Sequence, residues 1–471
     1  MGDAPTVGLA LIVRDEADSL PGLLKSIEGA FDQIVLVDTG SKDATVLTFT
    51  AWAEVEQHDH PGFTFKVEHF DWIDDFAAAR TFADSLLDTD WTCWADADDS
   101  IQGAQNLRGL AAQAPPELAA YVADYRYAVD DHGNTVCTLR RERLVRAGAG
   151  TWWGRVHEAQ LLQGPTTLVD PAVVLWVHRK SHEAKPSQPR NLRILRKWLK
   201  DEPHNPRVLG YLGTEEAAMG RHKIAVGYYR RYLKLKTGWD EERAQIHRKL
   251  SASLNALGEH HKARTVAYEA LNLLPSWPDS YLSLAQCSYH LGEHVQAIEW
   301  AQRVLELGQP DSLLILNPLD YTLQPQLVMA GAKGALGDVE AAIDHAERAL
   351  SIVPDQPHLQ QHLAGWKQAS KREHTAKMAV GHAQFLVAHD EQLKALTFLE
   401  GAVPYFAQDH PDVVAARSQL RERLYPLLDP TGTAEHYEGD TEGGYEDVSL
   451  VGNLPRARLL ADGIREQVAA R

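Results

Sequence analysis

The stretch Trp91-Thr-Cys-Trp-Ala-Asp96-Ala-Asp98-Asp99 joins an apolar, strand-like segment to three carboxylates. A strand that ends in this way holds its acids at one edge of a sheet. Oxygen ligands at this spacing suit Mn²⁺ or Mg²⁺, the hard cations that accompany phosphate groups. The alternative is an acidic surface turn or a helix N-cap, because isolated acidic pairs are common in loops. The neighbouring segments must decide between the two interpretations.

Short apolar runs place this stretch in an α/β domain. Runs at 7–13, 34–37 and 91–95 alternate with helical patterns such as 20–27. This alternation predicts a sheet with helical connections. Asp38 follows the second run as Asp96 follows the third. The carboxyl ends of parallel strands meet at one edge of a sheet, where ligands bind, so both acids are expected to face one crevice.

The second half of the chain carries a repeat. Four glycines each precede an alanine by five residues, and the glycines lie 38, 34 and 45 residues apart. The pairs are Gly220 and Ala225, Gly258 and Ala263, Gly292 and Ala297, and Gly337 and Ala342. A period near 34 residues is typical of stacked tetratricopeptide hairpins. The longest interval contains Asn317-Pro-Leu-Asp-Tyr321, which predicts a longer connection there.

Small residues at fixed positions indicate close helix packing in these repeats. The larger residues expected to fill the stacked core are Tyr228, Tyr229, Leu233, Tyr268 and Leu271. The patterns divide the chain into four parts. These are an α/β domain at 1–186, a linker helix at 187–204, helical repeats at 205–425, and an acidic, flexible tail with a short terminal helix at 426–471.

The amino-acid composition indicates which classes of partner this protein is not expected to bind. Asp and Glu number 65 against 47 Lys and Arg, so the net charge is −18. This charge disfavours binding to nucleic acid or anionic lipid. No run reaches the roughly 18 apolar residues of a membrane helix, so no stable membrane insertion is expected. The three cysteines show neither a disulfide nor a zinc pattern, which fits a reducing cytoplasm.

Four blocks in order resemble family 2 glycosyltransferases of the GT-A fold. They are Leu11-Ile-Val-Arg-Asp-Glu16, Ile34-Val-Leu-Val-Asp38-Thr-Gly-Ser-Lys-Asp43, Trp72-Ile-Asp-Asp-Phe-Ala-Ala-Ala-Arg80 and Asp96-Ala-Asp98. The resemblance covers residues 5 to 200, and the repeats behind it resemble the subgroup in which tetratricopeptide repeats follow the transferase. It implies an inverting, metal-dependent enzyme that uses a nucleotide-sugar donor, with a UDP-sugar favoured, and Mn²⁺ or Mg²⁺.

The resemblance also assigns roles to the donor side of the site. The residues implied to contact the nucleotide are Asp38, Arg80, Asp96, Arg14 and Glu16. The implied metal ligands are Asp98, Asp96 and His178, although His178 after a strand is also typical of a hydrogen-bonded structural residue. Asp99 is expected to cap the following segment. Thr81 and Asp15 stand where the family usually has Asn, so the donor's identity stays open.

The acceptor side is implied by the segment Thr151-Trp-Trp-Gly-Arg-Val-His157-Glu158, which matches the family's Gly-x-Val-His-Glu block. An inverting transfer needs a base that takes the acceptor proton, and Glu158 is the candidate. The residues expected to form the substrate pocket are Trp152, Trp153, Arg155 and His157. Ordinary core packing is the alternative for the two tryptophans.

Three functions follow from these features. The leading one is transfer of a sugar to a protein side chain gathered by the repeats, since helical solenoids present concave surfaces to proteins. The acceptor would be a Ser or Thr hydroxyl, or a Cys thiol as in bacteriocin-modifying relatives, on a bacterial or phage surface protein. Assembly of a cell-surface or lipopolysaccharide glycan is the second. The third is a non-catalytic scaffold. The repeat edges are also compatible with a homodimer.

Overall fold

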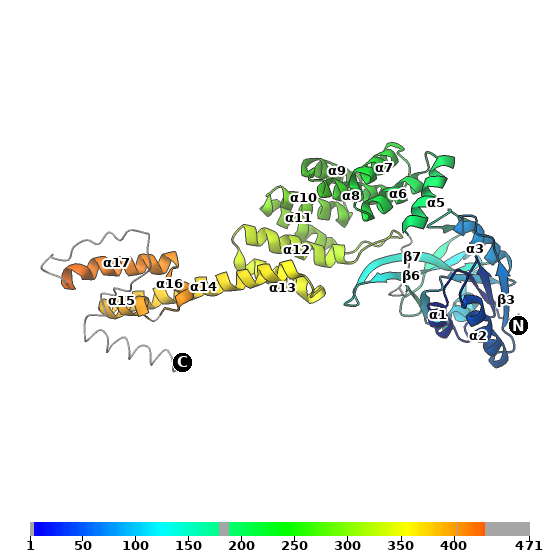
Figure 1. The fold of residues 1–471 in the computed structure, drawn as a ribbon, viewed down its shortest axis with the longest axis horizontal. Helices are drawn as coiled ribbons and strands as arrows, with labels where there is room; N and C mark the ends of the chain where they lie inside the picture. The colour runs from blue at the N-terminus through cyan, green and yellow to red at the C-terminus, as the bar shows by residue number, and fades with distance from the viewer. Residues whose placement is uncertain (1–3, 179–187, 402, 429–471) are drawn as a thin grey trace. The chain divides into compact units, whose positions relative to one another are not determined.

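The computed structural model describes residues 4–178, 188–401 and 403–428 (Figure 1). The chain forms two compact units. The first contains Met1–Ala332 with Ser351–Pro354, and the second contains Lys333–Leu350 with Asp355–Arg471.

The first unit begins with a mixed, nine-stranded sheet in the order β3-β2-β1-β4-β7-β6-β11-β5, with β10 beside β6. The strands are β1 (Val7–Val13), β2 (Gln33–Asp38), β3 (Thr64–His69), β4 (Trp91–Ala95), β5 (Asp99–Gln102), β6 (Ala120–Val129), β7 (Thr135–Arg146), β10 (Thr166–Leu168) and β11 (Leu175–His178). A separate hairpin pairs β8 (Gly150–Trp153) with β9 (Ala159–Leu162).

The predicted α/β order is confirmed. β1, β2 and β4 occupy the predicted apolar runs, and they lie parallel at the centre of the sheet. Strands buried on both faces are apolar throughout, which is why these runs do not alternate. The helices of this domain are α1 (Leu20–Ser26), α2 (Thr45–Asp59), α3 (Phe76–Ser85) and α4 (Leu107–Gln113).

The register of the sheet brings the first acids together. Val13 of β1 lies opposite Asp38 of β2, and Leu11 of β1 lies opposite Ala95 of β4. Asp38 and Asp96 therefore emerge at the same edge of the sheet, as the sequence predicts.

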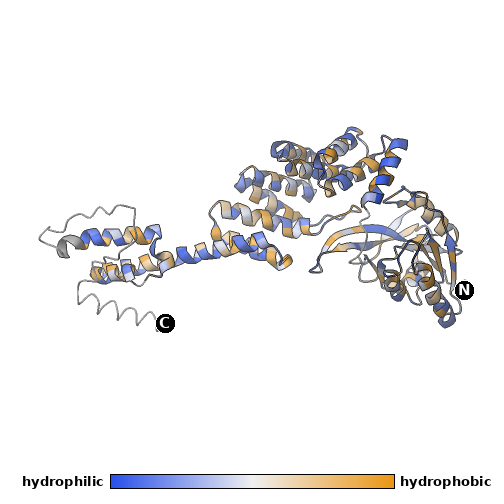
Figure 2. Ribbon diagram, in the orientation of Figure 1, coloured by the Kyte–Doolittle hydropathy of each residue, from blue (hydrophilic) through white to orange (hydrophobic). Residues whose placement is uncertain are grey.

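Helical hairpins follow the sheet. Their helices are α5 (Gln188–Asp201), α6 (Pro206–Ala218), α7 (His222–Lys234), α8 (Asp240–Ala256), α9 (His260–Leu273), α10 (Pro278–His290), α11 (His294–Leu307) and α12 (Leu319–Ala335). α5 lies within the predicted linker helix. Figure 2 shows hydrophobic and hydrophilic residues mixed along these helices, as expected when one face of each is buried.

The alanines of the repeated Gly–Ala pairs have the predicted packing role, but the prediction is wrong for the glycines, because a Cβ on any of the four would meet nothing within 4 Å. Gly220, Gly258 and Gly292 lie in the turns between paired helices with φ of 71°, 74° and 76°, a backbone region that favours glycine. The alanines that follow them are fully buried. Tyr268 was expected in the core, but this prediction is wrong, because its side chain is 38% exposed. The buried stripe of α9 consists of Ala263, Ala267 and Ala270, and Tyr268 lies beside it.

The long interval in the repeat has a structural cause. Thr138 of β7 exchanges two backbone hydrogen bonds of 2.9 Å with Leu316, which precedes α12. Arg140 of β7 pairs with Asp311, and the Gln245 side chain of α8 donates to the Ile315 carbonyl at 2.7 Å. The extra residues therefore bind β7 of the sheet to the repeats within the first unit.

The second unit is helical. Its helices are α13 (Val339–Ile352), α14 (Pro357–Ala388), α15 (Gln392–Gly401), α16 (Tyr405–Gln408) and α17 (Pro411–Leu428). Residues 426–428 of the predicted tail end α17, and the rest of that tail, including its terminal helix, lies outside the described residues. Among the residues that the structure describes, no helix is long and apolar enough to cross a membrane.

The close approach of α6 and α7 can be tested at two glycines. A Cβ on Gly213 would lie 2.4 Å from Cε1 of the buried Tyr229 ring, whereas a Cβ on Gly227 would meet nothing within 4 Å. We expect Gly213→Ala to destabilise the fold by about 1–3 kcal/mol through overpacking. The matched Gly227→Ala should stabilise it by about 0.4–1 kcal/mol. Urea unfolding followed by circular dichroism measures both, and equal effects of the two changes would contradict this packing.

Candidate active site

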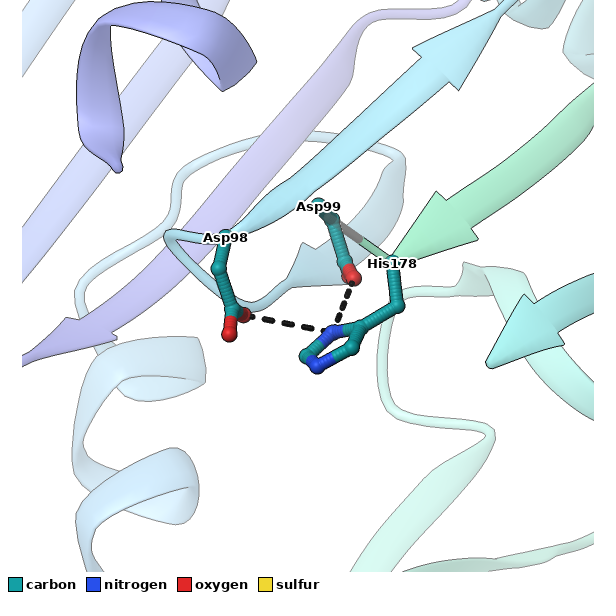
Figure 3. A group of neighbouring side chains, drawn as sticks. All are labelled: Asp98, Asp99 and His178. Atoms are coloured by element: carbon teal, nitrogen blue, oxygen red, sulfur yellow. Dashed lines mark hydrogen bonds and ion pairs between the residues drawn. The ribbon is translucent and has the colours of Figure 1, made fainter. Parts of the chain in front are cut away.

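Antiparallel pairing of β5 with β11 creates an acidic group at the sheet edge. In its register His178, the last residue of β11, lies opposite Asp99, the first residue of β5. His178 Nδ1 lies 3.3 Å from Asp98 Oδ1 and 3.3 Å from Asp99 Oδ1 (Figure 3). One ligand atom from each of the three residues falls within 4.8 Å of the others. The three side chains thus point to a common centre.

Asp99 has a role that the sequence did not reveal. Its carboxylate is fully buried, accepts hydrogen bonds from the Asp96 backbone N–H at 3.0 Å and from the Tyr125 hydroxyl at 2.6 Å, and faces His178. Asp99 therefore closes the acidic turn behind it instead of capping the segment that follows. The signal for this role is the pairing of β5 with β11, which involves residues more than 70 positions apart.

The electrostatics of this group favour a cation. Burial, assisted by the charges of Asp96 and Asp99, raises the pKa of Asp98 to about 7, although His178 opposes the shift. Burial also raises the pKa of Glu16. Burial alone would lower the pKa of His178, but its hydrogen bond to Asp99 and the charge of Asp98 raise it. Arg143 pairs with Asp99 at 3.9 Å, and the carboxylates of Asp98 and Glu16 share His178 as a neighbour of opposite charge.

These donors fit a divalent ion. Two carboxylates and an imidazole suit Mn²⁺, and carboxylates alone suit Mg²⁺. Asp98 and His178, both predicted as ligands, belong to the group, and Asp99 joins them. Asp96, the other predicted ligand, has its Oδ1 atom engaged by Arg80. A ligand role for Asp96 stays a prediction.

Arg80 joins this acidic edge to Glu158. The guanidinium is 4% exposed, and its Nη2 donates to Asp96 Oδ1 at 2.6 Å while its Nε donates to Glu158 Oε1 at 2.7 Å. Trp94 and Trp152 cover it, with ring centroids 4.4 and 5.2 Å from its central carbon.

The charges of this bridge stabilise one another. Burial would lower the pKa of Arg80, but Asp96 and Glu158 raise it, so the guanidinium stays charged. Burial would raise the pKa of Asp96, but Arg80 and Arg143 lower it. The predicted contact of Arg80 with the donor stays a prediction, and the observed partners of Arg80 are carboxylates.

The remaining predicted nucleotide residues lie at the same edge of the sheet. Asp38 accepts from the backbone N–H groups of Gly40 and Ser41, at 3.2 and 3.0 Å, and so forms the turn after β2. Arg14 is exposed just beyond β1, and the Glu16 backbone N–H donates to Thr45 Oγ1 at 2.7 Å. Their roles toward a nucleotide stay predictions.

Three of the four predicted pocket residues line a cavity of about 570 Å³ beside α3 and α5. Trp152, Trp153 and Arg155 lie in its wall together with Trp198, whereas Glu158 does not. Trp152 is buried, and its Nε1 donates to Asp84 at 2.7 Å. Arg155 pairs with Asp201 at 2.7 Å. Trp152 thus has the packing role that the sequence left open.

The fourth predicted pocket residue, His157, faces the repeats. Its ring stacks on Tyr211 of α6, with centroids 4.2 Å apart. A substrate contact for the four pocket residues stays a prediction.

Comparison with known proteins agrees with this geometry. Residues 9–183 match the family model described as glycosyl transferase family 2, and they form a domain of that family. The chain is 23% identical over 248 residues to the SPbeta prophage-derived glycosyltransferase SunS of Bacillus subtilis, which covers 51% of this chain and 56% of that relative. The chain thus spans about half the length of this curated relative.

The repeats also have relatives. A TPR repeat-containing protein of Synechococcus elongatus is 38% identical over 95 residues, or 20% of this chain and 21% of that protein. The crystal structure of a TPR protein from Thermus thermophilus aligns at a TM-score of 0.31 with 18% identity, over 38% of this chain and 90% of that one.

A metal titration tests the acidic group. Asp98→Asn removes one charged ligand, so Mn²⁺ affinity should fall by more than the roughly 10- to 100-fold that loss of an outer-shell contact costs. Isothermal titration of the nucleotide-free protein with Mn²⁺ measures it. The matched change Asp18→Asn, at an exposed acid of the same domain, should leave the affinity unchanged. Equal affinities for both variants would reject the group as a metal site.

Asp84 provides a test by pH. Burial raises the pKa of this carboxyl from 3.8 to about 6, although Trp152 donates to it. The ionised form is therefore disfavoured in the folded protein, and the resulting loss of stability grows from about pH 4 to pH 6. Asp84→Asn keeps an acceptor oxygen without the charge. It should raise the free energy of unfolding by about 1–3 kcal/mol above pH 7 and have little effect below pH 4.

Chemical unfolding at a series of pH values between 3.5 and 8 measures this difference. The exposed Asp18→Asn serves as the control, and it should show no comparable pH dependence. A difference between Asp84→Asn and the unchanged protein that is constant with pH would contradict the burial of a disfavoured charge.

Proposed function

We propose that this protein is an inverting glycosyltransferase that moves a sugar from a nucleotide-sugar donor, a UDP-sugar in the first instance, to a protein side chain. The observation that carries this proposal is the buried Arg80 bridge, which holds Asp96 and the candidate base Glu158 on one guanidinium beside the Asp98, Asp99 and His178 group. A family 2 domain at residues 9–183 supports the reaction class.

Glu158 has the setting of a base. Its side chain is 12% exposed, and its bond to Arg80 uses Oε1, so Oε2 can accept a proton. In the proposed reaction the acceptor's O–H or S–H attacks the anomeric carbon, and its proton passes to Glu158. The bond from that carbon to the diphosphate oxygen breaks, and the nucleoside diphosphate leaves with the electron pair. Arg80 fixes the direction of the carboxylate through this contact.

Asp98, Asp99 and His178 would hold Mn²⁺ or Mg²⁺ in this proposal. When bound, the ion supplies positive charge that stabilises the departing diphosphate. Tyr125 and the Asp96 backbone N–H keep Asp99 in place, and Tyr127 stacks on His178 with centroids 4.8 Å apart. The chain thus orients two of the three ligands, Asp99 and His178, through neighbouring groups, as is usual in metal sites.

A protein acceptor is supported by the repeats, because stacked hairpins offer an extended surface for peptides or protein faces. Their attachment to the sheet at β7 and at the Glu158 loop would present such an acceptor to the base. The small number and wide spacing of the cysteines, Cys93, Cys137 and Cys287, support a reducing, cytoplasmic setting. Glycan assembly at a cell surface is the alternative outcome of the test below.

The proposal is tested with a panel of nucleotide sugars, with and without Mn²⁺, and with candidate acceptors followed by intact-mass spectrometry. We expect a mass gain of one sugar that requires the ion. Glu158→Gln should lower the rate by about 10²–10⁴-fold and retain donor binding, because the amide can still accept the bond from Arg80 but cannot take the acceptor proton. The exposed Glu117→Gln is the matched control.

Three results would count against parts of this proposal. Turnover that is independent of metal would contradict the role given to the cation. An active Glu158→Gln variant would contradict the assignment of Glu158 as the base. Nucleotide-sugar binding without any transfer or donor hydrolysis would favour the scaffold function instead.

A further inference from the structure

The loop that carries Glu158 has a backbone that needs outside support. It connects β8 to β9, and within it Gly154 has φ of 103° and His157 has φ of 54°. The second value lies in the left-handed region, which is unfavourable for a residue with a side chain. His157 directly precedes Glu158, so its backbone conformation sets the direction in which the candidate base leaves the chain. Such a conformation persists only where surrounding contacts enforce it.

The enforcing contacts come from α6, the first helix of the repeats. The His157 ring stacks on Tyr211 at 4.2 Å with an angle of 17° between the ring planes. The His157 carbonyl accepts a hydrogen bond from the Arg207 guanidinium. His157 Nε2 lies 3.5 Å from Glu215 Oε1. Arg207, Tyr211 and Glu215 lie one turn apart on one face of α6, so a single helix face holds both the ring and the backbone of His157.

The residue before His157 is held in the same way. Val156 is 3% exposed and belongs to an apolar cluster built from α5 and α6. The other fully buried members of that cluster are Leu192, Ile194, Leu195, Trp198, Val208 and Leu212. Two consecutive residues before Glu158 thus have their side chains fixed by helices outside the sheet domain.

The sheet domain holds Glu158 from the opposite side. Arg80 of α3 binds the carboxylate, and Arg141 of β7 donates to the Glu158 carbonyl at 2.7 Å. The Arg207 guanidinium also lies over the Trp153 ring at 5.4 Å and over the Tyr211 ring at 5.2 Å, which joins the end of β8 to α6. Glu158 is therefore positioned between two sets of contacts, one from the sheet domain and one from the repeats.

We propose that α6 is part of the active site, and that Arg207 and Tyr211 are positioning residues for Glu158. This inference rests on the proposed function, in which Glu158 is the base. It gives the repeats a role in turnover as well as in acceptor recognition. A displacement of a reacting group by about 1 Å can cost about 100-fold in rate, so loosening this helix contact should slow the reaction without weakening donor binding.

The test uses the full chain and needs no acceptor, because water can replace it. In donor hydrolysis a water oxygen bonds to the anomeric carbon while its proton passes to Glu158, and the nucleoside diphosphate leaves. We expect Tyr211→Ala and Arg207→Met each to lower kcat for nucleoside diphosphate release by about 10- to 100-fold, with donor KM within about twofold. Tyr211→Phe keeps the stacked ring, so it should retain wild-type kcat.

Matched controls lie on the other helices of the repeats. Arg231 of α7 donates to the Pro203 carbonyl at 3.2 Å and lies over the Tyr228 ring at 5.8 Å, the same kinds of contact away from the Glu158 loop. Tyr268 of α9 is the aromatic control. Arg231→Met and Tyr268→Ala should leave kcat unchanged. Active-site concentration is corrected by the folded fraction from circular dichroism.

The outcomes separate the inference from the proposed function. If the unchanged protein neither transfers a sugar to any acceptor of the panel nor releases nucleoside diphosphate from any donor, the proposed function fails. If it is active, and Tyr211→Ala and Arg207→Met retain kcat within about twofold after correction, the inference alone is overturned. A rise in donor KM with unchanged kcat would also overturn it, because that result places α6 in donor binding.

Discussion

The candidate site depends on one buried guanidinium. Arg80 lies 4% exposed beneath two tryptophan rings and bonds Asp96 and Glu158 at the same time. A buried charge is unfavourable unless it is paired, so the arginine and the two carboxylates are stable only together. Because Arg80 comes from α3, Asp96 from the end of β4 and Glu158 from the β8–β9 loop, this pairing fixes three separate elements relative to one another.

The acids beyond the Arg80 bridge have different charged neighbours from those of Asp96. Asp96 is balanced by Arg80, whereas Asp98 lies next to Asp99 and Glu16 with His178 as its neighbour of opposite charge. Arg143 lies behind the group, fully buried, with its central carbon 3.7 Å from the Trp94 ring centroid and 4.3 Å from that of Tyr125. Arg80 thus neutralises Asp96, and Arg143 pairs with Asp99 at 3.9 Å, whereas the carboxylates of Asp98 and Glu16 share His178 as a neighbour of opposite charge. This asymmetry favours a cation at the Asp98 end.

The contacts that join the repeats to the sheet domain within the first unit include two that bear on the site and on the repeat length. α6 holds the loop before Glu158, and the residues that precede α12 pair with β7. The second attachment explains why one interval of the repeat is longer than the others. Both contacts involve residues far apart in the sequence, so an isolated repeat pattern gives no sign of them. Through these contacts the helical hairpins hold parts of the sheet domain in place.

Sequence by itself determined the central strands, the alternation of strands and helices, and the Gly–Ala pairs of the hairpins. These features follow from local rules, since buried parallel strands are apolar throughout and tight turns between packed helices favour glycine. The order of motifs also indicated the acids at the sheet edge and Glu158. The sequence misplaced Tyr268, because the helical period alone does not show which side of a stripe is covered.

Only the tertiary structure decided which side chains meet. Asp99 faces His178 because β5 pairs with β11, and Arg80 reaches both Asp96 and Glu158 because α3 lies beneath the β8–β9 loop. The stacking of His157 on Tyr211 likewise depends on where the first repeat helix lies. These partners depend on long-range packing and on the pairing of each buried charge with an opposite charge. A local pattern of residues shows neither of these conditions.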